Sequence, residues 1–241
     1  MNVQSNTYTF LYSTLVVLFV ATGLAVVSTA LQPAQVKNVE VEKKQNILTS
    51  LRVQSDMTNA EKLYSTYIIA SYTLNSKGEK VSGIDPFDIN LREELKKPAG
   101  ERNLPAFEAS KGDSSFLVIP VYGKGLWGPI WGYVSFRKGK AVSEGLPQFN
   151  TIYGVMFDHK GETPGLGAEI NQPFFQVPFR GKEIFDDKGK FVSVQVVKGG
   201  ADPASLHQVD AISGGTITSK GLQAMLDSCL VCYQIFFKSN N

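Results

Sequence analysis

The stretch Asp210-Ala211-Ile212-Ser213-Gly214-Gly215-Thr216-Ile217-Thr218-Ser219 sets two adjacent glycines between small hydroxyl residues, directly before a run that predicts a helix over 220–230. Glycine has no Cβ, so the backbone N–H groups of such a stretch can approach a bulky anion closely. The start of a helix adds unpaired N–H donors and a partial positive charge. The sequence therefore predicts a phosphate site at this turn.

The competing interpretation of the same stretch is a plain Gly-rich turn, in which Thr218 or Ser219 caps the following helix. Two common nucleotide motifs are excluded. No Gly-Lys-Ser/Thr ends the stretch, so it is not a P-loop, and the glycine spacing is not Gly-x-Gly-x-x-Gly. His207 lies close enough to be considered as a phosphate contact, beside a surface or hydrogen-bonding role. No His/Glu spacing predicts a metal site.

The pattern Asp210-x-x-Ser213-Gly214-Gly215-Thr216-x-Thr218-Ser219 resembles the covalent-flavin motif Asp-x-x-Ser-Gly-Ala-Thr-x-Thr-Ser of the FMN-binding domain in redox-driven ion pumps. The resemblance implies that a separate flavin transferase, using FAD, joins FMN to the Thr216 hydroxyl through a phosphoester. It also implies that Asp210 is part of what the transferase recognises. An external enzyme is chemically sensible, because a Thr hydroxyl without an adjacent base is a poor nucleophile. Gly215 departs from the alanine of the family, which adds local freedom.

A second motif is Glu162-Thr163-Pro164-Gly165-Leu166-Gly167. From the residues alone it predicts a rigid exposed loop between a strand and a helix. In the resembling family this motif is the second signature, which implies that its backbone and the Thr163 side chain approach the isoalloxazine ring, with Leu166 against the ring face.

The segment Gly125-Leu126-Trp127-Gly128 follows a predicted strand. Trp127 is read either as a core aromatic residue or as an apolar wall of a flavin site. The candidate FMN-binding residues are therefore Trp127, Glu162, Thr163, Gly165, Leu166, Gly167, Ser213, Gly214, Gly215, Thr218 and Ser219, with Thr216 as the attachment point.

The N-terminal segment from Tyr8 to Leu31 carries no charged residue. At about 1.5 Å per residue, roughly 20 residues cross about 30 Å of hydrocarbon. A cleaved signal peptide is the alternative, with Ser28 and Ala30 as a small-x-small site. No Lys or Arg precedes the apolar run, however, and the run is long for a signal peptide, so a membrane anchor is favoured.

The charges after this span conflict with the orientation that the resemblance implies. Lys37, Lys43, Lys44 and Arg52 follow the span, and the positive-inside rule taken alone keeps that side cytoplasmic. Long domains are translocated largely regardless of charge, and acidic residues stand among the lysines. The resemblance places the soluble domain on the periplasmic side of the bacterial cytoplasmic (inner) membrane, and we adopt that orientation as the expectation.

The remaining pattern predicts an α+β fold: one transmembrane helix, then one mixed FMN-binding domain. We expect an anchor over 1–35, a helical stalk and the first part of the soluble domain over 36–115, and the FMN-binding domain over 116–241. A capping box, Thr58-x-x-Glu61, predicts a helix to about Tyr67, and Pro120 indicates an edge strand or a bulge. The expected strands are 68–74, 80–81, 116–122, 130–137 and 152–157. The expected helices are 36–51, 88–97 and 168–175, and a hairpin is expected with strands 183–185 and 191–197 around a turn at 186–189.

Composition narrows the function classes. The 241 residues carry a formal net charge of only +2 and no basic block, so nothing points to nucleic acid binding. The two cysteines, Cys229 and Cys232, exclude a disulfide-dense framework. Packed hydrophobic thiols are the default interpretation.

The resemblance covers nearly the whole chain and is to the C subunits of the sodium-translocating NADH:quinone reductase, the Nqr complex. It implies a membrane-anchored covalent flavoprotein that relays electrons through FMN within the complex and has no activity by itself. The implied partners are the other Nqr subunits, in which sodium moves, and the flavin transferase. Two alternatives stay open: a G-type subunit of an Rnf ferredoxin:NAD electron-transport complex, and a non-redox anchored module that binds a phosphate ligand reversibly.

Overall fold

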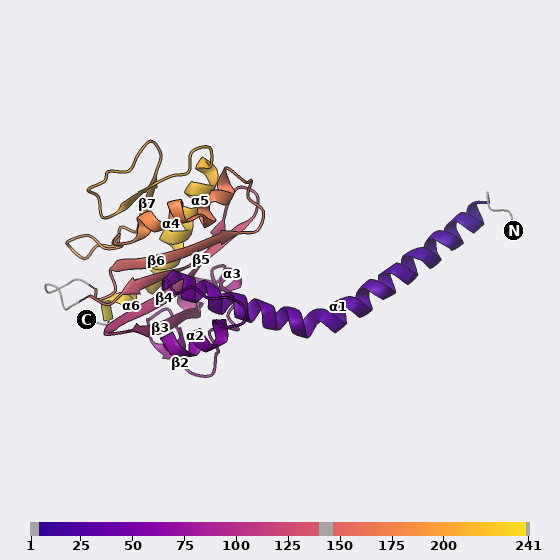
Figure 1. The fold of residues 1–241 in the computed structure, drawn as a ribbon, viewed down its shortest axis with the longest axis horizontal. Helices are drawn as coiled ribbons and strands as arrows, with labels where there is room; N and C mark the ends of the chain where they lie inside the picture. The colour runs from indigo at the N-terminus through magenta and orange to yellow at the C-terminus, as the bar shows by residue number, and fades with distance from the viewer. Residues whose placement is uncertain (1–4, 140–146, 240–241) are drawn as a thin grey trace. The chain divides into compact units, whose positions relative to one another are not determined.

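The computed structural model describes residues 5–139 and 147–239, and the chain divides into two units, Met1–Glu42 and Lys43–Asn241. The first unit belongs to α1 (Asn6–Ser50), which is one continuous helix and is labelled in Figure 1. The apolar part of α1 is long enough to cross a membrane and none of it is buried. The predicted helix over 36–51 is confirmed as the continuation of this span.

The second unit is built on an antiparallel sheet whose strand order is β2-β1-β3-β4-β5-β6. Chain neighbours pair directly in most of this sheet, as expected for short turns between alternating apolar segments. The predicted strands at 68–74, 80–81, 116–122, 130–137 and 152–157 are confirmed. The strands are β1 (Ile68–Leu74), β2 (Lys80–Val81), β3 (Leu104–Lys111), β4 (Ser114–Lys124), β5 (Pro129–Arg137) and β6 (Thr151–His159).

Two features of this sheet differ from the sequence expectation. β3 was not predicted, because Pro105, Ala106 and Glu108 are weak strand formers. The edge position or bulge suggested by Pro120 is wrong, since β4 lies between β3 and β5 and its register with β5 is continuous from Phe116 to Lys124. The β3–β4 pairing ends at Val118, whereas Pro120 faces Tyr133 of β5. The missing N–H of the proline therefore falls where the β3 side of β4 is no longer paired.

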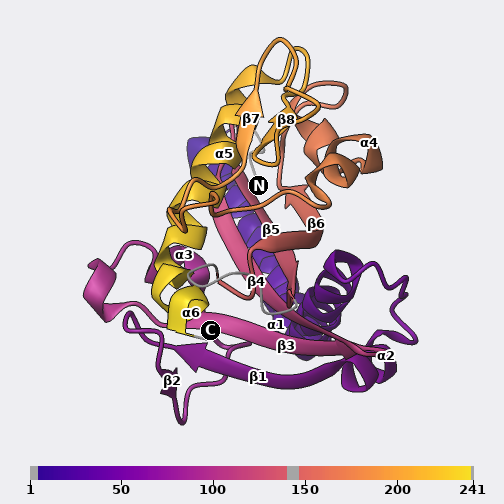
Figure 2. The ribbon, with the colours of Figure 1, turned by 90° about the vertical axis from the view of Figure 1, so that its left-hand side faces the viewer.

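Both faces of the sheet are covered. Along β4, Leu117 and Ile119 belong to the larger core, which includes the buried side of α5 (Thr216–Leu230). Phe116 and Val118 belong to a second cluster on the other face. Figure 2 shows α5 and α2 (Ala60–Tyr67) on opposite sides of the sheet. Side chains of β4 alternate between the two faces, so β4 is apolar on both.

The start of α2 does not use the predicted capping box. Asn59 occupies the cap position without a side-chain cap bond. Instead the Asp56 carboxylate accepts hydrogen bonds from the backbone N–H groups of Thr58 and Asn59 and from the Thr58 hydroxyl. The Thr58 hydroxyl thus belongs to the preceding turn, and an Asx-type turn begins the helix instead.

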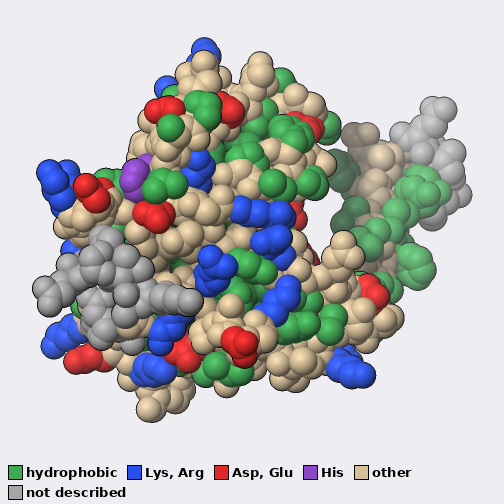
Figure 3. Space-filling model, turned by 60° about the vertical axis from the view of Figure 1, so that its left-hand side comes forward, with side chains coloured by type: hydrophobic (Ala, Val, Ile, Leu, Met, Phe, Trp, Pro, Cys, Tyr) green, Lys and Arg blue, Asp and Glu red, His purple; other side chains and the backbone are tan. Residues whose placement is uncertain are grey.

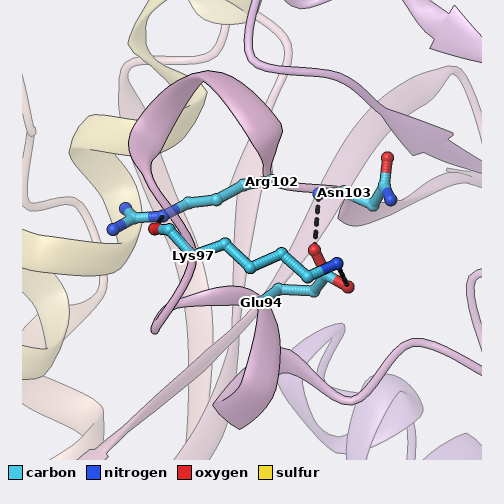
Figure 4. A network of polar contacts seen from close by, with 4 residues as sticks. All are labelled: Glu94, Lys97, Arg102 and Asn103. Carbon is cyan, nitrogen blue, oxygen red and sulfur yellow. Dashed lines mark hydrogen bonds and ion pairs between the residues drawn. The ribbon is translucent and has the colours of Figure 1, made fainter.

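The segment between β2 and β3 is held by a small polar network. It contains α3 (Leu91–Glu94), shorter than the helix predicted over 88–97, and η1 (Ala99–Glu101). As Figure 4 shows, the Glu94 carboxylate receives the Asn103 N–H at 2.9 Å and pairs with Lys97 at 2.8 Å, while Arg102 donates to the Lys97 carbonyl. These bonds fix the chain just before β3 begins.

The C-terminal half adds short elements around α5. The helix predicted over 168–175 is broken into η2 (Gly167–Asn171) and α4 (Pro173–Gln176), because Pro173 can only begin a helical turn. The predicted hairpin exists only as the isolated bridge between Phe185 and Phe191. β7 (Gln195–Val197) pairs instead with β8 (Gln208–Asp210), in parallel. The other elements are η3 (Val177–Phe179), η4 (Val231–Tyr233) and α6 (Gln234–Ser239).

Charged side chains of both signs are interspersed with hydrophobic ones on the face drawn in Figure 3. This mixture agrees with the small net charge of +2.

Candidate FMN site

The site lies at one end of the large sheet, where two loops leave neighbouring strands together. Lys124 pairs with Pro129 across β4 and β5, and Ile130 pairs with His159 across β5 and β6. The loop 125–128 and the loop 160–166 therefore emerge at the same end of the sheet. They carry the Trp127 segment and the Glu162–Gly167 motif.

The third segment, the first turns of α5, reaches this end because two glycines allow close packing. A Cβ added at Gly123 would lie 2.6 Å from the Met225 Cβ, and one added at Gly221 would collide with the Lys124 carbonyl oxygen. Neither glycine has a backbone conformation that favours glycine, so each matters because it has no side chain. Without a Cβ at these two positions the axis of α5 can approach β4 closely.

Glu162 joins the three segments. Its side chain is 5% exposed. One carboxylate oxygen accepts hydrogen bonds from the backbone N–H of Trp127 at 2.8 Å and of Gly128 at 3.3 Å. The other accepts the Thr218 hydroxyl at 2.5 Å. All three of these partners are donors, which is the pattern that an ionised carboxylate requires when it is buried.

The carboxylate fits between two glycines. A Cβ added at Gly125 would lie 2.5 Å from one Glu162 oxygen, and one added at Gly167 would collide with the Thr218 hydroxyl and lie 2.5 Å from the other Glu162 oxygen. By contrast, a Cβ added at Gly161 would meet nothing within 4 Å. Gly125 and Gly167 therefore make the space that the carboxylate occupies.

The helix begins earlier than predicted, and neither predicted cap is used. α5 starts at Thr216 with Gly215 at the cap position and no side-chain cap bond. The Thr218 hydroxyl is bound to Glu162, and the Ser219 hydroxyl accepts the Ile212 N–H at 3.1 Å. Glycine is an acceptable cap residue, so the helix can begin without either hydroxyl.

The earlier start puts Thr216 at the positive end of α5. The first bond of the helical ladder runs from Ser219 N–H to the Gly215 carbonyl at 2.9 Å, so the N–H groups of 216–218 precede the ladder. Thr216 is half-buried, whereas Ser213 and Gly214 are exposed. The helix start thus offers N–H donors that lie outside the ladder, together with a partial positive charge, beside the Thr216 hydroxyl.

The two glycines before Thr216 lie against Leu166. Gly214 has φ +76°, a left-handed conformation that favours glycine, and a Cβ there would lie 2.6 Å from Leu166 Cδ2. A Cβ added at Gly215 would lie 2.9 Å from Ile212 Cγ2 and 3.2 Å from the Leu166 carbonyl carbon. The second motif and the attachment motif are therefore in direct contact.

Apolar side chains around this end of the sheet face solvent. Trp127 is 70% exposed, Ile217 58%, Leu126 45% and Leu166 42%. The core role considered for Trp127 is therefore wrong, and four large apolar side chains from the three segments stand uncovered. Exposed apolar residues beside a few fixed polar groups are typical of ligand sites.

The remaining residues of the second motif shape the loop. The Thr163 carbonyl accepts hydrogen bonds from the N–H groups of Leu166 and Ala168, both at 3.1 Å, and its side chain is exposed. Gly165 has φ +75° and donates its N–H to Glu169 at 2.9 Å. The motif is thus a tight turn that presents Leu166 outward.

Asp210 has a local structural partner. At the end of β8 its carboxylate accepts the Ala201 N–H at 2.6 Å, which closes the loop through Gly199 and Gly200. Its side chain is otherwise exposed. His207, considered as a phosphate contact, uses Nδ1 to donate to the Glu183 carbonyl at 2.8 Å.

Two lysines that the sequence reasoning did not select lie beside Thr216. A cavity of about 330 Å³ is lined by Thr216, Ser219, Lys198 and Lys220, among others. Both lysines are exposed, and Lys198 directly follows the last residue of β7. Their signal in the sequence was weak: Lys198 precedes the pair Gly199-Gly200, and Lys220 directly follows the motif.

The cysteines are apart from this site. Both are free. Cys229 is buried in α5, and burial raises the pKa of its thiol to about 11. Cys232 accepts a hydrogen bond from Arg102 at 3.1 Å.

Known proteins match this arrangement. The FMN-binding domain family matches residues 125–231, a range that contains all three segments. The C subunit of the Na⁺-translocating NADH-quinone reductase of Pseudomonas aeruginosa is 31% identical over 93% of this chain and 91% of its own length. Its counterpart from Vibrio vulnificus is 32% identical over 84% of this chain and 83% of its own length.

Solved structures agree. The crystal structure of the C subunit from Parabacteroides distasonis has 40% identity and a TM-score of 0.75, covering 88% of this chain and 98% of that one. The crystal structure of Shewanella oneidensis NqrC has 30% identity and a TM-score of 0.67, covering 82% and 95%. Sequence, fold and site together show that this chain belongs to the family of Na⁺-translocating NADH-quinone reductase C subunits, with an FMN-binding domain in its C-terminal part.

Proposed function

We propose that this chain is the flavin-carrying C subunit of such a reductase, with FMN held covalently by a phosphoester to Thr216. The observation that carries the proposal is the position of Thr216. It is the first residue of α5, beside N–H groups that precede the helical ladder. A phosphate esterified there would meet these N–H donors and the positive end of the helix.

The surrounding residues fit the two parts of FMN. Lys198 and Lys220, which line the cavity beside Thr216, would add positive charge near the phosphate. The exposed side chains of Trp127, Leu166 and Ile217 would cover part of the apolar ring. FMN, when bound, supplies reversible electron uptake and release, and the protein sets its position and potential. A covalent tether keeps the flavin from diffusing away.

The proposed partners are the other subunits of the reductase and the flavin transferase that forms the ester. Asp210 is proposed as part of the surface that the transferase recognises, in addition to its bond to Ala201.

We further propose that α1 anchors the chain in the cytoplasmic membrane with the domain on the periplasmic side. A C-terminal alkaline phosphatase fusion should therefore be active. An inactive, stable fusion would contradict this orientation.

The direct test of the attachment is co-expression with the flavin transferase, followed by a denaturing gel under ultraviolet light. The wild-type band should fluoresce, and Thr216→Ala should be dark yet folded. Thr216→Ser keeps the hydroxyl and serves as the matched control, which should regain fluorescence. A fluorescent Thr216→Ala band would place the bond elsewhere. A dark wild-type band would favour the module that binds a phosphate ligand reversibly.

A further inference from the structure

We infer that Glu162 is a positioning residue that holds the attachment turn of α5 against the Trp127 loop, so that Thr216 is presented to the transferase in one geometry. The inference rests on the proposed function of Thr216. In this role Glu162 acts on other residues of the protein and not on the flavin. Both of its carboxylate oxygens are hydrogen-bonded within the protein, one to the N–H groups of 127 and 128 and the other to the Thr218 hydroxyl.

The first argument is connectivity. Thr218 and Glu162 are separated by 56 residues in sequence, and Trp127 and Glu162 by 35. Thr218 lies on the same helical turn as Thr216, two residues further on. A bond that fixes Thr218 therefore fixes the orientation of the turn that carries the attachment hydroxyl.

The second argument is the cost of removing the carboxylate. Within residues 5–139 and 147–239 no Lys or Arg forms an ion pair with Glu162, so backbone and hydroxyl donors compensate its charge. Truncation would leave the Thr218 hydroxyl and two loop N–H groups without their acceptor. The glycines at 125 and 167 would then border a void, because the carboxylate fills the space between them.

The third argument is that the backbone of Glu162 is also held. Its N–H donates to His159 Nδ1 at 3.2 Å, at the end of β6. The side chain therefore projects from a point anchored to the sheet, and it transmits that anchorage to the loop and to the helix. This is how a buried hydrogen-bonded network preorganises a site.

The experiment uses the full-length protein in detergent, made without the transferase and then labelled by purified transferase and FAD. In this labelling the Thr216 oxygen takes the FMN phosphoryl group, the phosphoanhydride bond of FAD breaks, and AMP leaves. The initial rate of covalent labelling is measured for each variant. Glu162→Ala and Thr218→Val should each slow labelling roughly 10- to 100-fold, because a displacement near 1 Å can cost about 10²-fold. The double variant should be no slower than Glu162→Ala, because Thr218→Val removes a hydrogen bond that Glu162→Ala has already removed.

Conservative variants separate geometry from charge. Glu162→Gln keeps a carbonyl for the two loop N–H groups and an amide that can donate to the Thr218 oxygen, so it should recover most of the rate lost in Glu162→Ala. Thr218→Ser keeps the hydroxyl and should likewise recover most of the rate. If Glu162→Gln were as slow as Glu162→Ala, charge would matter and the positioning role would be overturned.

Two controls separate positioning from general stability. Glu108 accepts the Tyr72 hydroxyl at 2.7 Å, a carboxylate–hydroxyl pair elsewhere in the sheet. Glu108→Ala should lower the melting temperature without slowing labelling. Gly161→Ala, in the same loop but in open space, should label at the wild-type rate. If Glu108→Ala slowed labelling as much as Glu162→Ala, a general loss of stability would explain the slow labelling, and the inference would be overturned.

The outcomes distinguish this inference from the proposed function. A wild type that the transferase does not label overturns both. A wild type that is labelled at Thr216, together with Glu162→Ala labelled at the same rate, overturns only the positioning role. Slow labelling of Glu162→Ala, rescue by Glu162→Gln and an unaffected Glu108→Ala together support it.

Discussion

The Thr218 hydroxyl donates to the buried Glu162 carboxylate at 2.5 Å. This bond brings together the two motifs that the sequence shows as separate signatures. It also explains why Gly125 and Gly167 are glycines, since a Cβ at either would enter the space of the carboxylate. The candidate site is therefore one connected structure rather than three loops that meet by chance.

The glycine pair before Thr216 gives a prediction about stability. Gly215→Ala introduces the alanine of the resembling motif, but its Cβ would lie 2.9 Å from Ile212 Cγ2. We expect a loss of about 1 kcal/mol in unfolding free energy, typical of modest overpacking. Gly214→Ala should cost more, because its φ of +76° is strained for alanine as well. Thermal unfolding of the two variants measures this order, and the reverse order would contradict it.

Asp210 allows its structural and recognition roles to be separated. Asp210→Asn keeps an oxygen that can accept the Ala201 N–H but removes the charge, whereas Asp210→Ala removes both. If the transferase reads the charge, both variants should lose labelling. If the loop closure alone matters, only Asp210→Ala should lose it. Labelling rates decide between these roles, with the melting temperature of each variant as the control. Normal labelling of both Asp210→Asn and Asp210→Ala would exclude both roles.

The buried thiol gives a prediction about pH. Burial raises the pKa of Cys229 from 9.0 to about 11 in the folded protein. The folded state therefore holds this proton more tightly than the unfolded state. The thiol's contribution to the unfolding free energy is complete below pH 9 and is lost as the pH rises towards 11. Cys229→Ala should show a smaller decline of stability over this range than the wild type. Parallel declines in the two proteins would contradict the assignment.

The same burial predicts selective thiol chemistry. At about pH 8, iodoacetamide should modify the half-buried Cys232 before the buried Cys229, because the thiolate is the reactive species. Peptide mapping after partial modification identifies the residue. Equal modification of both cysteines in the folded protein would show that Cys229 is accessible.

The unit boundary predicts where the chain can be shortened. A chain starting at Lys43 keeps Ile47 and Leu51, which are 0% and 1% exposed in the second core cluster. It should be monomeric, water-soluble and folded by circular dichroism. A chain starting at Val53 lacks both side chains and should be less stable by several kcal/mol, since each large core truncation costs about 2–5 kcal/mol. Equal melting temperatures would contradict the role of these residues.

The parts of the fold that local pattern determines were predicted from the sequence. The apolar run at 8–31 predicted the long helix, and alternating apolar residues predicted β1, β5 and β6. β3 was missed because Pro105 and Glu108 oppose strand formation locally, and pairing with β1 and β4 overrides that preference. β7 was assigned to a hairpin because its actual partner, β8, pairs with it in parallel, and a parallel pair has no tight turn between its strands to mark it in the sequence.

In the candidate site, too, the features set by local sequence were predicted and those set by contacts between separate segments were not. The motifs around Thr216 and Leu166 were visible as glycine-rich signatures. The position of the helix start was not, because Ser219 and Thr218 are strong cap residues whose hydroxyls bind Ile212 and Glu162 instead. The positioning role of Glu162 depends on a contact across 56 residues, which no local pattern encodes.

The most direct measurement is tandem mass spectrometry of the protein purified from its native membrane. The central claim predicts one peptide, containing Thr216, that is heavier by one FMN less one water, with fragment ions that place the added mass on that threonine. A mature protein in which the Thr216 peptide has only its unmodified mass, or whose flavin is released by acid precipitation, would contradict the claim.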